Sequence, residues 1–147
     1  MYDSILLATD GSEASAEATE HAVALAEATG ATLHALYVVD EDVYSAYSGD
    51  EYVQEHEGLE SGLEEEGEDA LAEVAAAADG SVDVVTELVH GTPSDEILAY
   101  GNEHDVDLIV VGTRERSAAY RNLLGSVTER VVRIASRPVT VVKTQID

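Results

Sequence analysis

The sequence predicts a single α/β domain over residues 1–147, built as a doubly wound, five-stranded parallel sheet with helices on both faces. The main observation is that five short apolar segments alternate with segments of helical period, which is typical of βαβ units. The apolar segments are nearly continuous, as expected of strands buried on both faces. The chain is also long enough for a real core, and without Phe or Trp that core is expected to be aliphatic.

The first half of the chain is predicted to contain two strands and two helices. A strand at residues 4–8 precedes a helix at about residues 12–29, and a second strand follows at residues 31–39. Residues 40–56 are acidic and aperiodic, which predicts a loop, and a second helix follows at about residues 57–78. The apolar stripes comprise Ala14, Ala18, Ala22, Leu25 and Ala26 on the first helix, and Leu59, Leu63, Ala70 and Val74 on the second.

The second half is predicted to contain three strands and two helices. The strands are expected at residues 82–89, 106–111 and 138–143. Between the first two of these strands lies a helix at residues 93–104, and the last helix begins at residue 126.

Both of these helices have recognisable starts. Thr92 is expected to be an N-cap, because Pro93 suits the first helical position and Asp95 follows three residues after the cap. Ser126 is expected to cap the last helix, with Glu129 completing a capping box. The inward side of this helix is expected to comprise Val127, Val131 and Ile134, and the solvent side Arg130, Arg133 and Arg137.

The positive charge of the chain is confined to its end. All seven Lys and Arg residues lie from Arg114 onward. They follow directly on Gly112, which ends an apolar run, and Gly125-Ser126 then open the last predicted helix. A glycine at a strand end, an arginine-bearing loop and a helix N-terminus together predict an anion site in an otherwise acidic chain.

The strand order decides which residues meet at such a site. Right-handed crossovers leave few orders, and ligands of doubly wound sheets bind where the winding reverses. With the order 3-2-1-4-5, Asp10 and Gly112 would face each other across a crevice between the first and fourth strands. With the order 2-1-3-4-5, Gly91 would replace Gly112. The anion-binding pattern after the fourth strand favours the first order.

The composition argues against several functional classes. A formal net charge of −24 without a basic stripe makes nucleic acid an unsuitable partner. No apolar segment approaches the roughly 20 residues of a membrane span, and no basic signal-peptide head is present, so a cytoplasmic location is expected. The lack of cysteine excludes disulfides and thiolate metal sites. The five histidines show no metal-ligand spacing and are expected at ordinary surface or edge positions.

The acidity itself has two interpretations. An acidic surface can bind an unidentified protein partner, or it can adapt the protein to a salt-rich cytosol. At about 1 M salt the Debye length falls to roughly 3 Å, so repulsion between surface charges is screened. The acidic residues are spread along the chain rather than gathered in a tail, which favours salt adaptation and a halophilic source.

Four separated motifs, in this order along the chain, resemble the universal stress protein family. They are Thr9-Asp10-Gly11-Ser12, Gly91-Thr92-Pro93, Asp107-Leu108-Ile109-Val110-Val111-Gly112 and the segment at residues 123–132. The resemblance covers the whole chain and implies the sheet order 3-2-1-4-5, of the adenine-nucleotide-hydrolase-like type. It also implies a stress-response or regulatory role, and one branch of the family binds ATP through the motif G-x2-G-x9-G-(S/T).

The resemblance implies an ATP site with Mg²⁺ or Mn²⁺. Asp10 is implied to face the ribose and a metal-bridged phosphate, and Val38 to lie on the adenine side. Each has a plainer interpretation: Asp10 could cap the first helix together with Glu13, and Val38 could be ordinary strand packing. The implied cofactor-binding residues are Ala8, Thr9, Asp10, Val38, Gly112, Arg114, Glu115, Arg116, Gly125, Ser126 and Val127.

Glu115 departs from the motif, because it stands at the second glycine position. A glycine there lets the backbone approach a phosphate, whereas a glutamate adds bulk and negative charge. Arg114 and Arg116 could still provide bidentate phosphate contacts. The alternative function is a dimeric protein-interaction module of the same fold that binds no nucleotide. No nucleophile–base–acid set is visible, so catalysis beyond slow ATP hydrolysis is not expected.

The resemblance also implies a homodimer through the last strand, at residues 138–143. This strand is predicted to lie at an edge of the sheet, where unpaired backbone groups can accept a second chain. Val139 and Val141 share one face, and Thr140 and Val142 the other. We therefore expect helices to cover one row and the partner to bury the other.

Overall fold

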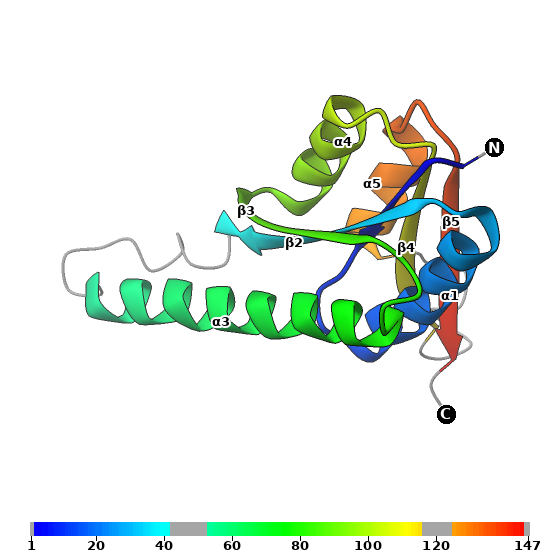
Figure 1. Ribbon diagram of the computed structural model, residues 1–147. Coiled ribbons are helices and arrows are strands. Elements are labelled where there is room, and N and C mark those ends of the chain that lie inside the picture. Colours follow the sequence, from blue (N-terminus) through cyan, green and yellow to red (C-terminus); the bar gives the residue numbers. More distant parts are fainter. Residues whose placement is uncertain (1, 42–52, 116–124, 146–147) are drawn as a thin grey trace.

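The computed structural model describes residues 2–41, 53–115 and 125–145. Its five strands form one parallel sheet in the order β3-β2-β1-β4-β5 (Figure 1). This confirms the predicted fold class and order, and excludes the order 2-1-3-4-5. The elements are β1 (Ser4–Ala8), α1 (Glu13–Thr29), β2 (Thr32–Asp40), α3 (Val53–Ala78), β3 (Val84–Gly91), α4 (Pro93–Glu103), β4 (Leu108–Glu115), α5 (Ser126–Ile134) and β5 (Val139–Gln145).

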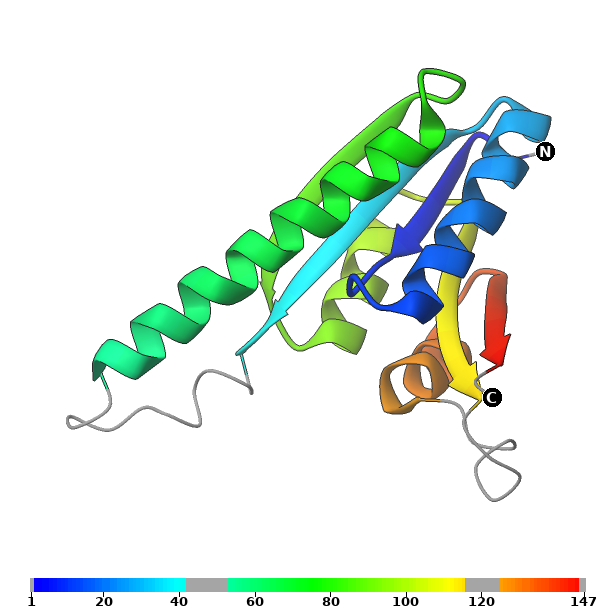
Figure 2. The same ribbon diagram turned by 90° about the horizontal axis from the view of Figure 1, so that it is seen from below.

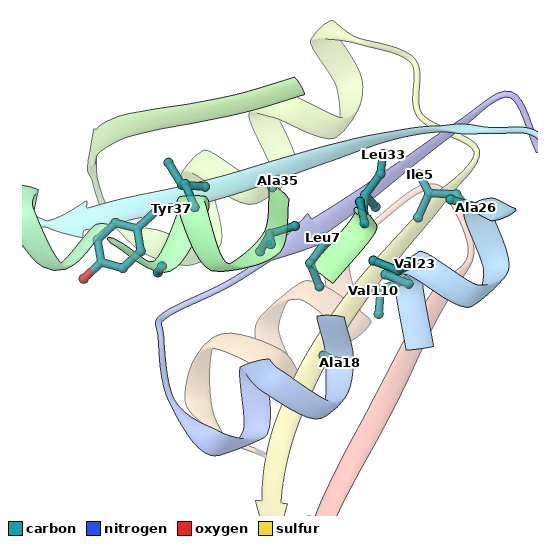
Figure 3. Close-up of a cluster of buried hydrophobic side chains, with 14 of the residues drawn as sticks. Ile5, Leu7, Ala18, Val23, Ala26, Leu33, Ala35, Tyr37 and Val110 are labelled. Atoms are coloured by element: carbon teal, nitrogen blue, oxygen red, sulfur yellow. The ribbon is translucent and has the colours of Figure 1, made fainter. Parts of the chain in front are cut away.

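Two hydrophobic cores lie on opposite faces of the sheet. Helices α1 and α3 cover one face, and α4 and α5 cover the other (Figure 2). Successive residues of a strand point to opposite faces, so Ile5 and Leu7 join the first core while Leu6 joins the second. Figure 3 shows the first core, in which Leu33 and Val110 of neighbouring strands lie beside β1. Burial on both faces explains why the central strands β1, β2 and β4 are nearly continuously apolar, whereas the edge strand β3 is partly exposed.

Several element boundaries differ from those predicted. Helix α3 begins at Val53, within the segment predicted to be a loop, and it extends past the end of β2 (Figures 1 and 2). The rest of that loop, residues 42–52, lies outside the described residues. Strand β3 is shifted two residues toward the C-terminus, and β4 continues beyond Gly112 to Glu115. The extension of β4 contains polar residues, so apolar periodicity could not reveal it; the neighbouring strand β5 provides its backbone partners.

The predicted start of α5 is wrong by one residue. Gly125 is the N-cap and Ser126 is the first helical residue, so Ser126 cannot cap with its side chain. Val131 is fully buried as predicted, but Ile134 is 52% exposed because it follows Val131 by less than a full turn and leaves the sheet-facing side. Arg137 lies beyond the helix, and its partly buried guanidinium donates to the carbonyl of Val106 at 2.7 Å.

The start of α4 follows the prediction in part. Thr92 occupies the N-cap position in an extended conformation and Pro93 is the first helical residue. The Thr92 side chain, however, makes no capping hydrogen bond.

Strand β5 lies at the edge of the sheet, next to β4. Val142 packs against the α1 and α3 core, whereas Val139 and Val141 pack against the α4 and α5 core. The expectation that helices would leave one row of β5 uncovered is therefore wrong. What remains open is the backbone edge of β5, on the side away from β4.

Membrane insertion has no candidate segment in the described part of the chain. None of the helices there is both long enough and apolar enough to cross a bilayer.

Two glycines of α3 provide a test of the packing of this helix on the sheet. A Cβ added at Gly67 would lie 2.5 Å from the Tyr37 ring and 2.7 Å from Leu88, whereas one added at Gly62 would meet nothing within 4 Å. We predict that Gly67→Ala lowers the free energy of unfolding by about 1–3 kcal/mol through overpacking. The matched control Gly62→Ala should raise it by roughly 0.5–1 kcal/mol through helix propensity. Urea titrations compare them, and equal effects at both positions would contradict the described packing.

Candidate functional site

A pocket of about 310 Å³ opens at the carboxyl ends of β1 and β4. In this strand order the winding reverses between these two strands, which is where ligands of such sheets bind. The lining residues are Ala8, Thr9, Asp10, Ser15, Leu36, Tyr37, Val38, Asp40, Leu63, Pro93, Ile97, Val111, Gly112, Val127 and Thr128.

The structure brings together six of the implied site residues in this lining: Ala8, Thr9, Asp10, Val38, Gly112 and Val127. Gly125 and Ser126 begin helix α5 just before Val127 but do not themselves line the pocket. The backbones of Arg114 and Glu115 belong to β4 rather than to a loop, which corrects the prediction. Arg116 lies outside the described residues.

A tight turn positions Asp10 between β1 and α1. Its Oδ1 atom accepts hydrogen bonds from the Ser12 amide at 2.9 Å and from the Ser15 hydroxyl at 2.6 Å. Ser12 is the N-cap of α1 and accepts from the Ser15 amide, while Gly11 adopts a positive φ of 80°. Capping by Asp10 together with Glu13 is therefore wrong: Ser12 caps the helix, and Asp10 stabilises the turn before it. Both bonds use Oδ1, so these two serines leave the other carboxylate oxygen available for a ligand.

The Asp10 carboxyl is held in its ionised form. Burial raises its pKa, but the hydrogen bonds from Ser12 and Ser15 together outweigh burial, so the pKa lies below its ordinary value of 3.8. Tyr37, also in the lining, has a raised pKa because of burial and the nearby charges of Glu66 and Asp10. At neutral pH the pocket therefore presents the Asp10 carboxylate in its ionised form and the Tyr37 phenol in its neutral form, and Asp40 is a second acidic residue in the lining.

Gly112 is required by packing as well as by its place in the pocket. A Cβ at this position would lie 2.5 Å from the carbonyl oxygen of Ala14 and 3.3 Å from the Ala18 side chain. The small alanines on the buried side of α1 therefore allow this helix to pass directly over the end of β4. A side chain at Gly112 would displace the N-terminal turn of α1, and with it the Asp10 turn.

Two hydrogen bonds fix helix α5 to the end of β4. The Gly125 amide donates to Thr113 Oγ1 at 3.3 Å, and the Thr128 hydroxyl donates to the Gly112 carbonyl at 3.2 Å. The first backbone N–H groups of a helix lack acceptors within the helix, so its N-terminus attracts anions. Since Val127 and Thr128 line the pocket, the first turn of α5 forms part of its wall.

The other side of the pocket is apolar and was largely missed from the sequence. Leu36 and Val111 could have been found by strand alternation, because they share a face with Val38. Pro93 and Ile97 come from α4, and only the three-dimensional arrangement places them here.

The described arginines after β4 do not line the pocket. Arg130 pairs with Asp95 at 3.2 Å, and Arg133 pairs with Glu129 at 2.9 Å. These exposed pairs each contribute at most about 1 kcal/mol to stability. Arg137 is held by Asp105 at 3.3 Å and by the protein backbone. Arg130, Arg133 and Arg137 therefore bring no positive charge to the pocket lining, whereas the helix dipole of α5 does.

The sequence matches the Universal stress protein family over residues 1–143. It is 40% identical to Universal stress protein MJ0531 of Methanocaldococcus jannaschii over 144 residues, which cover 97% of this chain and 83% of the relative.

Solved structures of similar proteins share the fold. Universal stress protein UspA from Lactobacillus plantarum superposes with a TM-score of 0.79 at 32% identity, covering 96% of this chain and 97% of that one. A universal stress protein solved in complex with cAMP superposes with a TM-score of 0.67 at 24% identity, covering 97% of both chains. At that identity the second likeness concerns the fold alone.

We predict that the Asp10 turn makes a pH-dependent contribution to the stability of the fold. Because the folded pKa of Asp10 is lowered, its ionisation stabilises the fold above the unfolded pKa, and this contribution is lost as pH falls through the folded pKa. Ser15→Ala removes one hydrogen bond to the carboxylate, so the pKa of Asp10 should rise. The variant should lose about 1 kcal/mol of stability at neutral pH, and the deficit should shrink below about pH 4.

Carboxyl-carbon NMR titration of Asp10, together with urea unfolding at several pH values, measures both effects. Ser94→Ala is the control, since Ser94 is similarly buried at the start of α4. An Asp10 pKa that stays the same in Ser15→Ala would contradict the described turn.

Proposed function

Because the chain belongs to the universal stress protein family, we propose that it is a cytoplasmic, nucleotide-binding stress-response or regulatory protein whose pocket takes ATP with Mg²⁺ or Mn²⁺. The observation that supports this most is the composition of the pocket wall. Residues from the ends of β1, β2 and β4 and the start of α5, implied by resemblance to the ATP-binding branch, line one cavity at the reversal point of the sheet.

The two sides of the pocket suit the two ends of a nucleoside. Val38, Leu36 and Ile97 form an apolar wall that would hold the adenine ring. Asp10 would accept a hydrogen bond from a ribose hydroxyl or bind the divalent cation, because an ionised carboxylate repels a bare phosphate but attracts a metal ion that bridges to it. The cation would supply charge neutralisation between Asp10 and the phosphates.

The phosphates would lie at the N-terminus of α5. Backbone amides of its first turn and the helix dipole both favour negative charge there. Gly125 presents no side chain to obstruct such an approach, and a Cβ added there would meet nothing within 4 Å. Arg114 and Arg116 would provide further phosphate contacts. Glu115 opposes binding by its charge, and the divalent cation would offset this repulsion.

The alternative is a dimeric protein-interaction module that binds no nucleotide. Glu115 favours this alternative. It stands at the second motif glycine, where the backbone would come close to a phosphate, and its negative charge would repel that phosphate. In either case we propose a homodimer paired through the open edge of β5. Val132 and Ile134 of α5 are 43% and 52% exposed, which is a further apolar surface that a second copy could cover.

Nucleotide binding is tested by calorimetric titration of the full chain with ATP and MgCl₂ in molar KCl. We expect one saturable site in the wild-type protein. Gly125→Asp should weaken binding at least tenfold, about 1.4 kcal/mol, because its carboxylate would stand at the phosphate position. Aspartate is a good N-cap, so this variant should stay folded.

Gly125→Ala is the matched control, since it adds bulk without charge and should bind within about threefold of the wild type. A wild-type protein that gives neither heat nor a thermal shift at millimolar ATP would favour the interaction module instead.

The dimer is tested by light scattering in molar KCl. The Ile109 amide donates to the Pro138 carbonyl, so alternation directs the Val141 backbone N–H away from β4, to the open edge. We expect twice the chain mass of 15.6 kDa for the wild type and the single mass for Val141→Pro, which removes that outward donor. Melting curves confirm that the variant is folded. A wild-type monomer, or a Val141→Pro dimer, would exclude this interface.

A further inference from the structure

A second group of potential ligand atoms lies where α3 passes the end of β3. Glu60 and Glu64 are one turn apart on α3, and His90 is the penultimate residue of β3. The His90 Nδ1 atom lies 3.7 Å from Glu60 Oε1, and its Nε2 atom lies 3.9 Å from Glu64 Oε1. One ligand atom from each residue can be chosen so that all three lie within 4.8 Å of one another.

The fold brings these side chains together in two steps. Residues four apart on a helix share a face, so both glutamates of the pair point the same way from α3. His90 is the register partner of Val39, whose side chain belongs to the core under α1 and α3. His90 therefore leaves the sheet on the side covered by α3 and meets the two carboxylates.

We propose that Glu60, Glu64 and His90 form a binding site for one divalent transition-metal ion, with Zn²⁺ as the ion that best fits the donor set. Carboxylate oxygens and imidazole nitrogens both bind Zn²⁺, and open zinc sites combine three protein ligands with a water molecule. The two carboxylates together balance the charge of the ion. This site is distinct from the cation expected with ATP in the pocket.

The donor atoms lie close enough to share an ion after small side-chain movements. The 3.7 and 3.9 Å separations exceed the roughly 2.7–3.2 Å of an N–H···O bond, and they involve different nitrogens of the His90 ring, of which one would bind the ion. Zn²⁺ ligands lie about 2.0–2.2 Å from the metal, so tetrahedral donors stand about 3.4 Å apart, against the present limit of 4.8 Å for one atom from each residue. The three side chains are 32–43% exposed and can close this difference by rotamer adjustment.

Charge also favours a cation at this place. Two glutamates one turn apart repel each other, and an ion between them replaces repulsion with attraction. The bound ion would connect α3 to β3 beside the pocket, because Leu63 lies between the two glutamates in the helix and lines the pocket wall. Metal binding is therefore expected to raise the stability of the chain without nucleotide.

The site is tested on the full chain, freed of metal by chelator and kept without nucleotide in molar KCl. Competition with a chromophoric chelator measures the affinity for Zn²⁺. We expect one ion per chain, a higher melting temperature with Zn²⁺, and a loss of about tenfold or more in affinity for both His90→Gln and Glu60→Gln/Glu64→Gln. NMR of histidine ring nitrogens should show metal-bound shifts at His90 and not at His21.

The control separates a defined site from general attraction of cations to an acidic surface. Glu65→Gln/Glu68→Gln removes the same charge from exposed positions of the same helix and should change the affinity less than twofold. Equal losses in the two double variants would overturn the proposal, as would an unchanged affinity in His90→Gln. A chain that takes up no Zn²⁺ at millimolar concentration would overturn it as well.

Discussion

The close packing of α1 over the end of β4 is the contact on which the site depends. It is possible because position 112 has no side chain and because the residues of α1 that face it, Ala14 and Ala18, are alanines. That contact holds the first turn of α1 in place, and the same turn contains the serines that bind Asp10. Gly112 also accepts the hydroxyl of Thr128, so one short segment of β4 fixes both helices that flank the pocket.

The electrostatics of the molecule follow from the same arrangement. With a net charge of −24, an anionic ligand meets repulsion over most of the surface. Arg130, Arg133 and Arg137 are engaged by acidic partners or by the backbone. Attraction is therefore expected from the helix N-terminus and from divalent cations, together with the contacts proposed for Arg114 and Arg116. In so acidic a chain, divalent metal ions are expected to attract an anionic ligand in the way that lysine side chains do in less acidic proteins. Adaptation to a salt-rich cytosol stays a prediction.

Much of the fold could be predicted from the sequence, because continuous apolar strands and glycine-marked helix ends are local signals. The strand order could not be predicted from local signals. Only the pattern around Gly112 and the resemblance to a family favoured the order 3-2-1-4-5. The strand order placed Asp10 and Gly112 opposite each other, and the resemblance implied these two and four further pocket residues. The α4 contribution through Pro93 and Ile97 was not predicted, since it depends on how a helix packs over a neighbouring strand. The cluster of Glu60, Glu64 and His90 was missed for the same reason: His90 lies far from the two glutamates in the sequence, and tertiary packing alone brings it to them.

Predictions of element boundaries from the local sequence were wrong where two local signals competed. Both Gly125 and Ser126 can cap a helix, and hydrogen bonding of the Gly125 amide to Thr113 decided for the glycine. Likewise, apolar periodicity ended β4 at Val111, whereas backbone pairing with β5 carried the strand to Glu115.

We propose the crevice between β1 and β4 as the place where a nucleotide binds. Two-dimensional amide NMR of the ¹⁵N-labelled chain in molar KCl, titrated with ATP and MgCl₂, tests it most directly. We expect saturable shifts at the amides of Thr9, Asp10, Gly112 and Val127, with those of β5 unaffected. A titration that leaves these four amides unmoved, or that shifts only residues 139–143, would contradict it.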